Sequence, residues 1–550
     1  MTTERFMREW EHYADHQYYS TMAEEQARID AFVLEFLHAF SQPEYVIPPE
    51  YRMTFIQLNP LISNVVAMSC VGTTDAWLAV VGRQRDNLAK ILTLYSARNT
   101  TWIDPAHLFA ANPTAASLWY CQYLRTFPSS LCDKDAADRL VRVVRHVDPR
   151  WKAPHALAEI YFGATYIDGE SERAFKTHLN GLVGRQVSVC ESVNPRRIGV
   201  CTAFWYREHS ACRIQYDFVA SLQADYELVL VQLEGPPEAD IDTRIFREVV
   251  KDPAGCRMLY FPDVGMTAES VVMANRRSTP IQVTTYGHPV SVWGGEVDYF
   301  IVGAESEDLP LLRYHYGERA VVLPGLGVVQ ARPKWERKGV EPASGPVRVN
   351  CSWYAQKVNG RLVAMLKQIL DRVDSEVVFC LWVGSSLNKA NHYLPFVKTM
   401  RAALGAEHVE VRPAMPFADY MDILEAGHLA LDSYPFGGSN VVIDSLHAGR
   451  PIVCREGSHW YNRIGPAWLR RLGLGDLIAQ SEYEYVEKAA RLIDNRRWRE
   501  EMTAQVRGLD LDEQVYSQRE VPSFKRAIDL LMREHETLQA GGSREPIWVS

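Results

Sequence analysis

Apolar residues recur at helical spacing through roughly the first 185 residues, where strand-like apolar runs are few. The clearest stretch carries Ile29, Phe32, Val33, Phe36, Leu37 and Phe40. These positions form one continuous apolar stripe on an α-helix, and a helix with such a stripe packs against other helices. No 34-residue self-similarity is present, which argues against a tetratricopeptide array. The pattern predicts an all-α domain over residues 1–185.

The pattern changes near Asn194, where short apolar runs begin to alternate with amphipathic stretches. The runs are residues 198–204, 228–233, 258–261, 281–284, 299–302, 347–351, 377–383, 409–411, 429–432 and 452–454. Runs of this length between helical segments predict βαβ units and parallel sheets.

A polar, proline-containing segment at residues 331–346 interrupts the alternation and is the best candidate for a linker. We therefore predict two Rossmann-like α/β halves, residues 186–335 and 345–520, followed by a C-terminal helix and tail over residues 521–550. Two such halves imply a cleft between them. Ligands of open α/β sheets bind outside the carboxyl ends of the strands, so functional residues are expected directly after strands.

Composition and charge narrow the classes of protein. The 550 residues are 47% apolar and 23% charged, which excludes wholesale disorder. The net charge is −9 and no basic stripe is present, so no nucleic-acid partner is expected. No run of 18 apolar residues and no apolar leader are found, so we expect a cytoplasmic protein without membrane insertion. The ten cysteines form no C-x-x-C pair, which disfavours a zinc ribbon or a redox motif.

The most informative stretch is residues 429–453, which reads as strand, glycine-rich turn, helix, turn and strand. Gly437 and Gly438 let the backbone approach a ligand closely, and Ser439 or Asn440 can cap the helix that follows. Free N–H groups and the helix dipole favour a diphosphate at such a terminus. A plain helix cap behind two turn glycines is the alternative interpretation.

This loop carries the pattern Pro-Phe-Gly-x-x-Asn followed by an aspartate, formed by Pro435, Phe436, Gly437, Asn440 and Asp444. The pattern resembles the donor-binding half of glycosyltransferase family 41. That family contains the eukaryotic O-linked N-acetylglucosamine transferases and the bacterial cytoplasmic N-glycosyltransferases that modify high-molecular-weight adhesins, and the bacterial branch is closer. Asp444 lies one turn into the helix, where its carboxylate could accept hydrogen bonds from ribose hydroxyls.

The resemblance extends over roughly residues 75–540 and is weakest in the helical region. It implies an all-α domain fused to a GT-B core of two Rossmann-like halves that face a cleft. It also implies a UDP-sugar donor and a protein or peptide acceptor. Lys357, which follows the 347–351 run, aligns with the family lysine that neutralises the nucleotide diphosphate. Without the resemblance, a lone lysine after a strand is more simply a solvated surface residue.

Two loops of the first half also match the family. Gly287 and His288 belong to a Gly-His-Pro loop and are expected to contact the phosphates or the sugar. His209 matches a family histidine that is followed four residues later by an arginine, here Arg213. If helical, the two share a face, so that His209 accepts a proton or orients the acceptor while Arg213 supports it. For each histidine, a structural hydrogen bond is the alternative. Phe204 stands where the family pattern has a further histidine, on the acceptor side.

Ser385 departs from the family as well, because the N-glycosyltransferases carry glutamine near the donor sugar at this point. The shorter side chain is expected to enlarge the sugar pocket or remove a contact to a hydroxyl. Asp-x-Asp pairs occur at 133/135, 240/242 and 510/512. None directly follows a buried strand, and a lysine with a helix terminus can supply the charge at the phosphates, so we expect no metal and no other cofactor.

The leading hypothesis is an inverting, metal-independent glycosyltransferase that moves a hexose, expected to be glucose, from a UDP-sugar to asparagine in Asn-x-Ser/Thr of proteins such as adhesins. The alternatives are O-glycosylation of serine or threonine and a non-catalytic subunit that presents a substrate protein. Retention of Lys357, Asn440 and Asp444 argues against the non-catalytic subunit.

Overall fold

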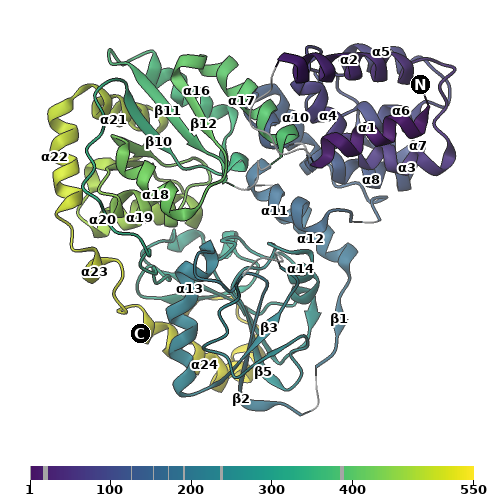
Figure 1. Ribbon diagram of the computed structural model, residues 1–550. Coiled ribbons are helices and arrows are strands. Elements are labelled where there is room, and N and C mark those ends of the chain that lie inside the picture. The colour runs from purple at the N-terminus through teal and green to yellow at the C-terminus, as the bar shows by residue number, and fades with distance from the viewer. Residues whose placement is uncertain are drawn as a thin grey trace. The chain divides into compact units, whose positions relative to one another are not determined.

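The computed structural model describes residues 2–15, 23–125, 127–152, 154–170, 172–189, 192–235, 240–384 and 389–550. The chain forms two compact units, and Figure 1 labels their helices and strands. The first consists of residues 1–156, 163–175 and 345–416, and the second of residues 157–162, 176–344 and 417–550. The four predicted domains follow the order of elements along the chain, and their bounds stay a prediction.

The N-terminal part of the first unit is helical, as predicted. Its helices are α1 Thr3–Asp15, α2 Ala23–Phe40, α3 Arg52–Gln57, α4 Asn59–Met68, α5 Asp75–Val81, α6 Leu88–Leu94, α7 Pro105–Ala111, α8 Pro113–Arg125, α9 Phe127–Ser130 and α10 Lys134–Arg145. All six residues of the predicted stripe on α2 are buried. Phe36 lies edge-to-face against Phe6 and Trp10, with ring centroids 4.9 Å apart in each pair.

Three parallel strands complete the first unit. The elements are β10 Val347–Cys351, α16 Gly360–Leu370, β11 Val377–Trp382, α17 Ala390–Leu404 and β12 Val409–Arg412. β11 pairs in parallel with both β10 and β12. All three strands coincide with predicted runs to within one residue.

The second unit holds an eight-stranded sheet of order β16-β9-β8-β7-β5-β2-β3-β4, in which neighbours pair in parallel. The strands are β2 Asn194–Thr202, β3 Glu227–Gln232, β4 Glu248–Val250, β5 Cys256–Phe261, β7 Ile281–Thr284, β8 Tyr299–Gly303, β9 Arg319–Leu323 and β16 Ile547–Trp548. Its other elements are β1 Gln186–Val187, α13 Ser210–Ser221, α14 Ala268–Ala274, β6 Arg276–Arg277 and α15 Leu312–His315. Two helices, α11 Leu157–Ile167 and α12 Glu172–Val183, belong partly to each unit.

Both faces of this sheet are buried, which explains the continuous apolar runs in its strands. Val200 and Leu230 face a core shared with α13 and α24, whereas Cys201 and Val231 face the opposite core, to which Ala274 of α14 belongs. Figure 1 shows α13 and α24 running side by side against this sheet.

The C-terminal segment packs on the same sheet. In α24, Val521–Ala540, Phe524 stacks on Phe218 of α13 with ring centroids 4.4 Å apart. β16 then pairs with β9 at the sheet edge, with Ile547 opposite Val321. Neither β9 nor β16 is among the predicted strands. β16 spans only two residues, too few to show a periodicity.

Three further parallel strands in the second unit carry the glycine-rich loop. They are β13 Leu429–Leu431, β14 Ile452–Arg455 and β15 Ile478–Ala479. The helices around them are α18 Phe417–Ala426, α19 Asn440–His447, α20 Ile464–Arg471, α21 Glu482–Asp494, α22 Arg496–Arg507 and α23 Leu511–Gln514. The predicted order of strand, turn, helix and strand over residues 429–453 is confirmed.

The predicted linker, residues 331–346, contains neither helix nor strand. Its middle is nevertheless anchored within the second unit. Trp335 is buried beside Met421 and Leu424 of α18. The buried carboxylate of Glu425 accepts backbone hydrogen bonds from residues 338–340 at 2.7 to 3.2 Å. None of the helices in the described ranges is both long and apolar enough to cross a membrane.

Candidate functional site

The α19 helix begins at the carboxyl end of β13, behind a tight turn. A Cβ atom at Gly437 would lie 2.6 Å from Asp432 Oδ2 and 2.9 Å from the carbonyl oxygen of Tyr461, so this position requires glycine. The backbone N–H of Gly438 donates to Asp432 Oδ2 at 3.4 Å. Phe436 is buried and stacks on Tyr461, with ring centroids 4.5 Å apart. The turn is therefore held by close packing.

Ser439 is the N-cap residue of α19, but its side chain does not cap the helix. Its hydroxyl accepts a hydrogen bond from Trp468 Nε1 at 3.3 Å instead. Among the described residues, the backbone N–H groups of Ser439, Asn440 and Val441 form no hydrogen bond. Three donors that point out of a helix N-terminus are the groups that bind an anion.

The Asn440 side chain ties α19 to the start of α13. Its Nδ2 donates to the carbonyl oxygen of Ser210 at 3.2 Å, and its Oδ1 accepts from Gln330 Nε2 at 2.8 Å. Gln330 is fully buried and was not predicted as a site residue. It directly precedes the predicted linker, at a position where no local pattern marks it.

Asp444 and Arg213 form a buried ion pair between α19 and α13. Arg213 donates to the two carboxylate oxygens of Asp444 at 2.6 and 3.1 Å. The Arg213 guanidinium thus pairs with the opposite charge on α19, and its support of His209 stays a prediction. Asp444 is only 2% exposed, so a ribose hydroxyl could use only the lone pairs that Arg213 leaves open. Its ribose contact stays a prediction.

His209 caps α13 rather than lying within it. Its Nδ1 accepts a hydrogen bond from the backbone N–H of Ala211 at 3.4 Å, and its ring stacks on Phe204 with centroids 4.5 Å apart. Burial lowers the pKa of His209 to about 4, so the ring is neutral at neutral pH. Because Nδ1 accepts, the proton of the neutral ring resides on Nε2, which makes Nε2 a donor.

A buried carboxyl group missed by the sequence reasoning lies beside this cap. Thr202, at the end of β2, accepts from the backbone N–H of Phe204 at 2.9 Å and donates to Asp263 Oδ2 at 2.7 Å. Asp263 follows β5, and burial raises its pKa to about 7. Both polar residues stand at or just after predicted strands, and that position is the signal that could have identified them.

The Gly-His-Pro loop lies at the end of β7. A Cβ atom at Gly287 would lie 2.0 Å from the carbonyl oxygen of Pro262, so packing against the loop after β5 explains this glycine. His288 is buried, with Nδ1 2.9 Å from the carbonyl oxygen of Val264 and its ring against Phe162. Burial holds the pKa of His288 well below its ordinary value, so its ring brings no positive charge to a phosphate.

The structure does not test two of the predicted site residues. Lys357 belongs to the first unit, in a short 3-10 helix, Ala355–Lys357, shortly after β10. It is half-buried, and its place at the diphosphate stays a prediction. Ser385 lies outside the described residues.

One aspartate of each Asp-x-Asp pair has a structural role. Asp133 caps α10 and Asp510 caps α23, each through its carboxylate. Asp242 is ion-paired with Arg244 and Arg207.

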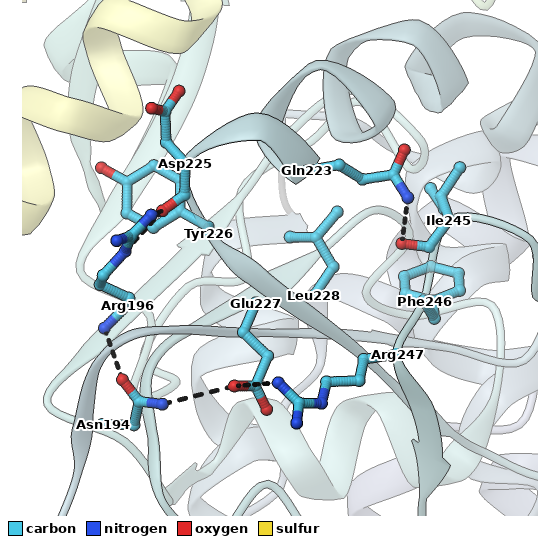
Figure 2. Close-up of a pocket in the computed structure, with 10 residues that line it drawn as sticks. All are labelled: Asn194, Arg196, Gln223, Asp225, Tyr226, Glu227, Leu228, Ile245, Phe246 and Arg247. Atoms are coloured by element: carbon cyan, nitrogen blue, oxygen red, sulfur yellow. Dashed lines mark hydrogen bonds and ion pairs between the residues drawn. The ribbon is translucent and has the colours of Figure 1, made fainter.

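A pocket of about 490 Å³ opens at the end of the eight-stranded sheet where β2 and β3 begin (Figure 2). Its lining residues are Asn194, Arg196, Gln223, Asp225, Tyr226, Glu227, Leu228, Ile245, Phe246 and Arg247. They include the amino ends of β2 and β3, whereas ligands of such sheets bind at the carboxyl ends. Its polar groups bond one another: Arg196 donates to the carbonyl oxygen of Asp225, and Arg247 donates to Glu227. The α19 terminus is the better candidate site.

Comparisons with known proteins bear on the fold and on the relatives of the chain, not on the place of the site. No protein-family model matches the chain. A UDP-glucose:protein N-beta-glucosyltransferase of Actinobacillus pleuropneumoniae is 29% identical over 262 residues, 47% of this chain and 41% of that protein. A probable UDP-N-acetylglucosamine–peptide N-acetylglucosaminyltransferase, SPINDLY of Arabidopsis thaliana, is 28% identical over 220 residues, 38% of this chain and 23% of that protein. The chain therefore spans less than half the length of these relatives.

The solved structure of a Thermobaculum terrenum O-GlcNAc transferase variant superposes with a TM-score of 0.62 at 16% identity, over 91% of this chain and 100% of that one. This likeness confirms the predicted fold class, a GT-B glycosyltransferase fold with a helical N-terminal region. The predicted resemblance to the bacterial protein N-glycosyltransferases of family 41 is confirmed by the relatives that the chain matches.

Proposed function

We propose that the chain is a UDP-sugar-dependent protein glycosyltransferase, and that α19 holds the diphosphate of the donor. The observation that carries the proposal is the uncapped first turn of α19, where three backbone N–H groups are free behind a turn that requires glycine. A diphosphate would satisfy these donors and would be stabilised by the helix dipole. The names of the relatives agree, because both use a UDP-linked sugar.

The charge that develops on the departing UDP needs compensation beyond the helix terminus. We assign this role to Lys357, and we propose that transfer needs no metal ion. Fixed charges and dipoles aimed at a leaving group supply much of the acceleration in such reactions. The roles of Asp133, Asp242 and Asp510 in caps and ion pairs support this proposal, since their carboxylates already have protein partners.

On the acceptor side, His209 suits orientation better than proton abstraction. Its Nδ1 is occupied by the backbone N–H of Ala211, and its pKa of about 4 makes it a weak base at neutral pH. The Nε2–H can donate a hydrogen bond to an acceptor carbonyl or to a sugar oxygen. Phe204 fixes the ring plane by stacking.

For the transferred sugar and the acceptor, we propose glucose and the asparagine of Asn-x-Ser/Thr, in acceptors such as adhesins. The anomeric carbon would be attacked from the face opposite to UDP, which inverts its configuration. The match to a UDP-glucose:protein N-beta-glucosyltransferase favours this choice. Transfer of N-acetylglucosamine to serine or threonine is the second candidate, and the match to SPINDLY supports it.

The decisive experiment incubates the purified chain with UDP-glucose and a peptide that contains Asn-Ala-Thr. Release of UDP with a gain of one hexose on asparagine, located by mass spectrometry, is expected. The Gln-Ala-Thr peptide serves as control and should stay unmodified. Activity should persist in EDTA, and the new linkage should be β by NMR. Absence of both UDP release and mass gain would contradict the proposal, whereas modification of the threonine would favour the second candidate.

A further inference from the structure

A second pocket, of about 670 Å³, lies in the second unit next to the start of α24. Its lining residues are Glu305, Pro324, Gly325, Ala467, Arg470, Arg471, Arg519, Glu520, Ser523 and Arg526. Four of these ten residues are arginines and two are glutamates, so the lining carries net positive charge.

Two of the arginines are neutralised within the protein. Arg471 donates to Glu305 at 2.7 Å and to the buried Glu520 at 2.8 Å. Arg470 donates to both carboxylate oxygens of Glu456, at 2.9 and 3.1 Å. These pairs fix the wall of the pocket and leave little charge for a ligand.

The other two arginines have no aspartate or glutamate partner in the described part of the chain. Arg519 makes only a 3.5 Å contact to the carbonyl oxygen of Gln514, and Arg526 uses Nε to donate to the main-chain oxygen of Ser550, the last residue of the sequence, at 2.6 Å. Both side chains are exposed at the rim of the pocket. A planar guanidinium whose remaining donors are open is suited to bind a carboxylate in two-point geometry.

The pocket lies at the carboxyl ends of the strands of the eight-stranded sheet, as do the Gly287 loop and the segment between β2 and α13 that carries His209. Pro324 and Gly325 directly follow β9, and Glu305 follows β8, whereas Gly287 follows β7. β9 is two strands from β7 and four from β2. At about 4.8 Å per strand, these steps span roughly 10 to 19 Å, which an extended chain covers in about three to six residues.

We propose that this pocket, defined by Arg519 and Arg526, binds an acidic side chain of the acceptor polypeptide three to six residues away from the glycosylated residue. The proposal rests on the proposed function, because it gives the acceptor a second point of attachment. It names the substrate class as segments with aspartate or glutamate at that spacing. An open rim with two guanidinium groups suits one carboxylate on a passing chain.

The test uses Asn-Ala-Thr peptides with a single glutamate placed three to six residues to either side of the asparagine, each beside its glutamine counterpart. For the wild type, we expect kcat/KM to be roughly three- to tenfold higher for glutamate at one spacing, through KM, with the preference falling as salt rises. Arg519→Gln with Arg526→Gln should remove the preference. Arg496→Gln with Arg497→Gln, an exposed pair on α22, is the matched control and should retain it.

Equal kcat/KM for glutamate and glutamine peptides at every spacing would overturn the proposal, as would a preference that survives in the double variant. Fluorescence anisotropy with the same peptides, carrying a label, measures binding independently of glycosylation, so it tests the pocket even if the proposed function is wrong. If no peptide is glycosylated, the proposed function fails, and tighter binding of the glutamate peptide by the wild type than by the double variant still supports the pocket. Binding of inorganic phosphate without any preference among peptides would assign the pocket to a small anion and contradict the proposal.

Discussion

The starts of α13 and α19 meet in space, yet their first turns differ. At α13, the His209 side chain accepts a hydrogen bond from the backbone N–H of Ala211. At α19, Ser439 occupies the same position, but its hydroxyl bonds Trp468 and accepts no backbone N–H of the first turn. The contact from Asn440 to the carbonyl oxygen of Ser210 joins the two starts.

The difference suggests a division of roles: the N-cap side chain of α13 bonds its own helix, whereas that of α19 leaves the backbone donors of the first turn to a ligand. A serine that caps its helix stabilises the fold by about 1 kcal/mol, and α19 forgoes this gain although a serine is in place. A bound anion would recover it. In the same unit, Ser481 caps α21 through its side chain, so a serine in this position can cap a helix of this protein.

The largest effect on stability is expected from breaking the ion pair between α13 and α19. Arg213→Met leaves the Asp444 carboxylate buried without its partner, and one-sided loss of a buried ion pair costs about 3–5 kcal/mol. Urea unfolding should show this loss, while Arg213→Met with Asp444→Leu should lose less than Arg213→Met alone. Arg497→Ala, which breaks an exposed pair on α22, should leave the midpoint unchanged. Equal urea midpoints for Arg213→Met and wild type would contradict the claim that this ion pair stabilises the fold.

The next effect concerns the charge that is proposed to act together with the α19 terminus. Lys357→Ala should lower kcat by roughly 10²–10³, because one preorganised charge at the leaving group is lost. Lys367→Ala, an exposed lysine on α16, is the control and should keep full activity. Steady-state UDP release checks both variants. Wild-type turnover by Lys357→Ala would disprove the assignment.

The surroundings of the α13 cap can be tested through the pH dependence of stability. The pKa of Asp263 is about 7 in the folded state against 3.8 for the free group, so between these values the folded protein holds a proton that the unfolded chain has released. Stability therefore falls as pH rises through this window. Asp263→Asn lacks the titration, and its stability relative to wild type should rise by roughly 2 kcal/mol from pH 5 to 6.5. Parallel curves for the two proteins would contradict the pKa assignment.

In the eight-stranded sheet, β2, β3, β5, β7 and β8 could be predicted because their residues are buried on two faces and form continuous apolar runs, whereas β9 was missed although it is buried as well. The glycine-rich turn could be predicted for a different reason. Gly437 and its neighbours are close in sequence, so residue type and order alone predicted the strand, turn and helix.

The partners across the site could not be predicted. Arg213 and Asp444 are 231 positions apart. No local pattern indicates that the arginine will pair with an aspartate on another helix. His209 fits helical spacing, so only the backbone reveals that it is the cap and not a member of the helix. Side-chain choices between competing partners are decided by tertiary packing.

The central claim is that the free N-terminus of α19 binds the diphosphate, and titration calorimetry with UDP tests it most directly. Ser439→Asp places a carboxylate at this terminus, where it should cap the helix and repel the diphosphate. We predict at least about tenfold weaker UDP binding, which is about 1.4 kcal/mol. Ser481→Asp at α21 and Ser439→Ala should bind UDP within about twofold of wild type, since neither adds charge at α19. Unchanged UDP affinity in Ser439→Asp, with the fold intact, would contradict the account.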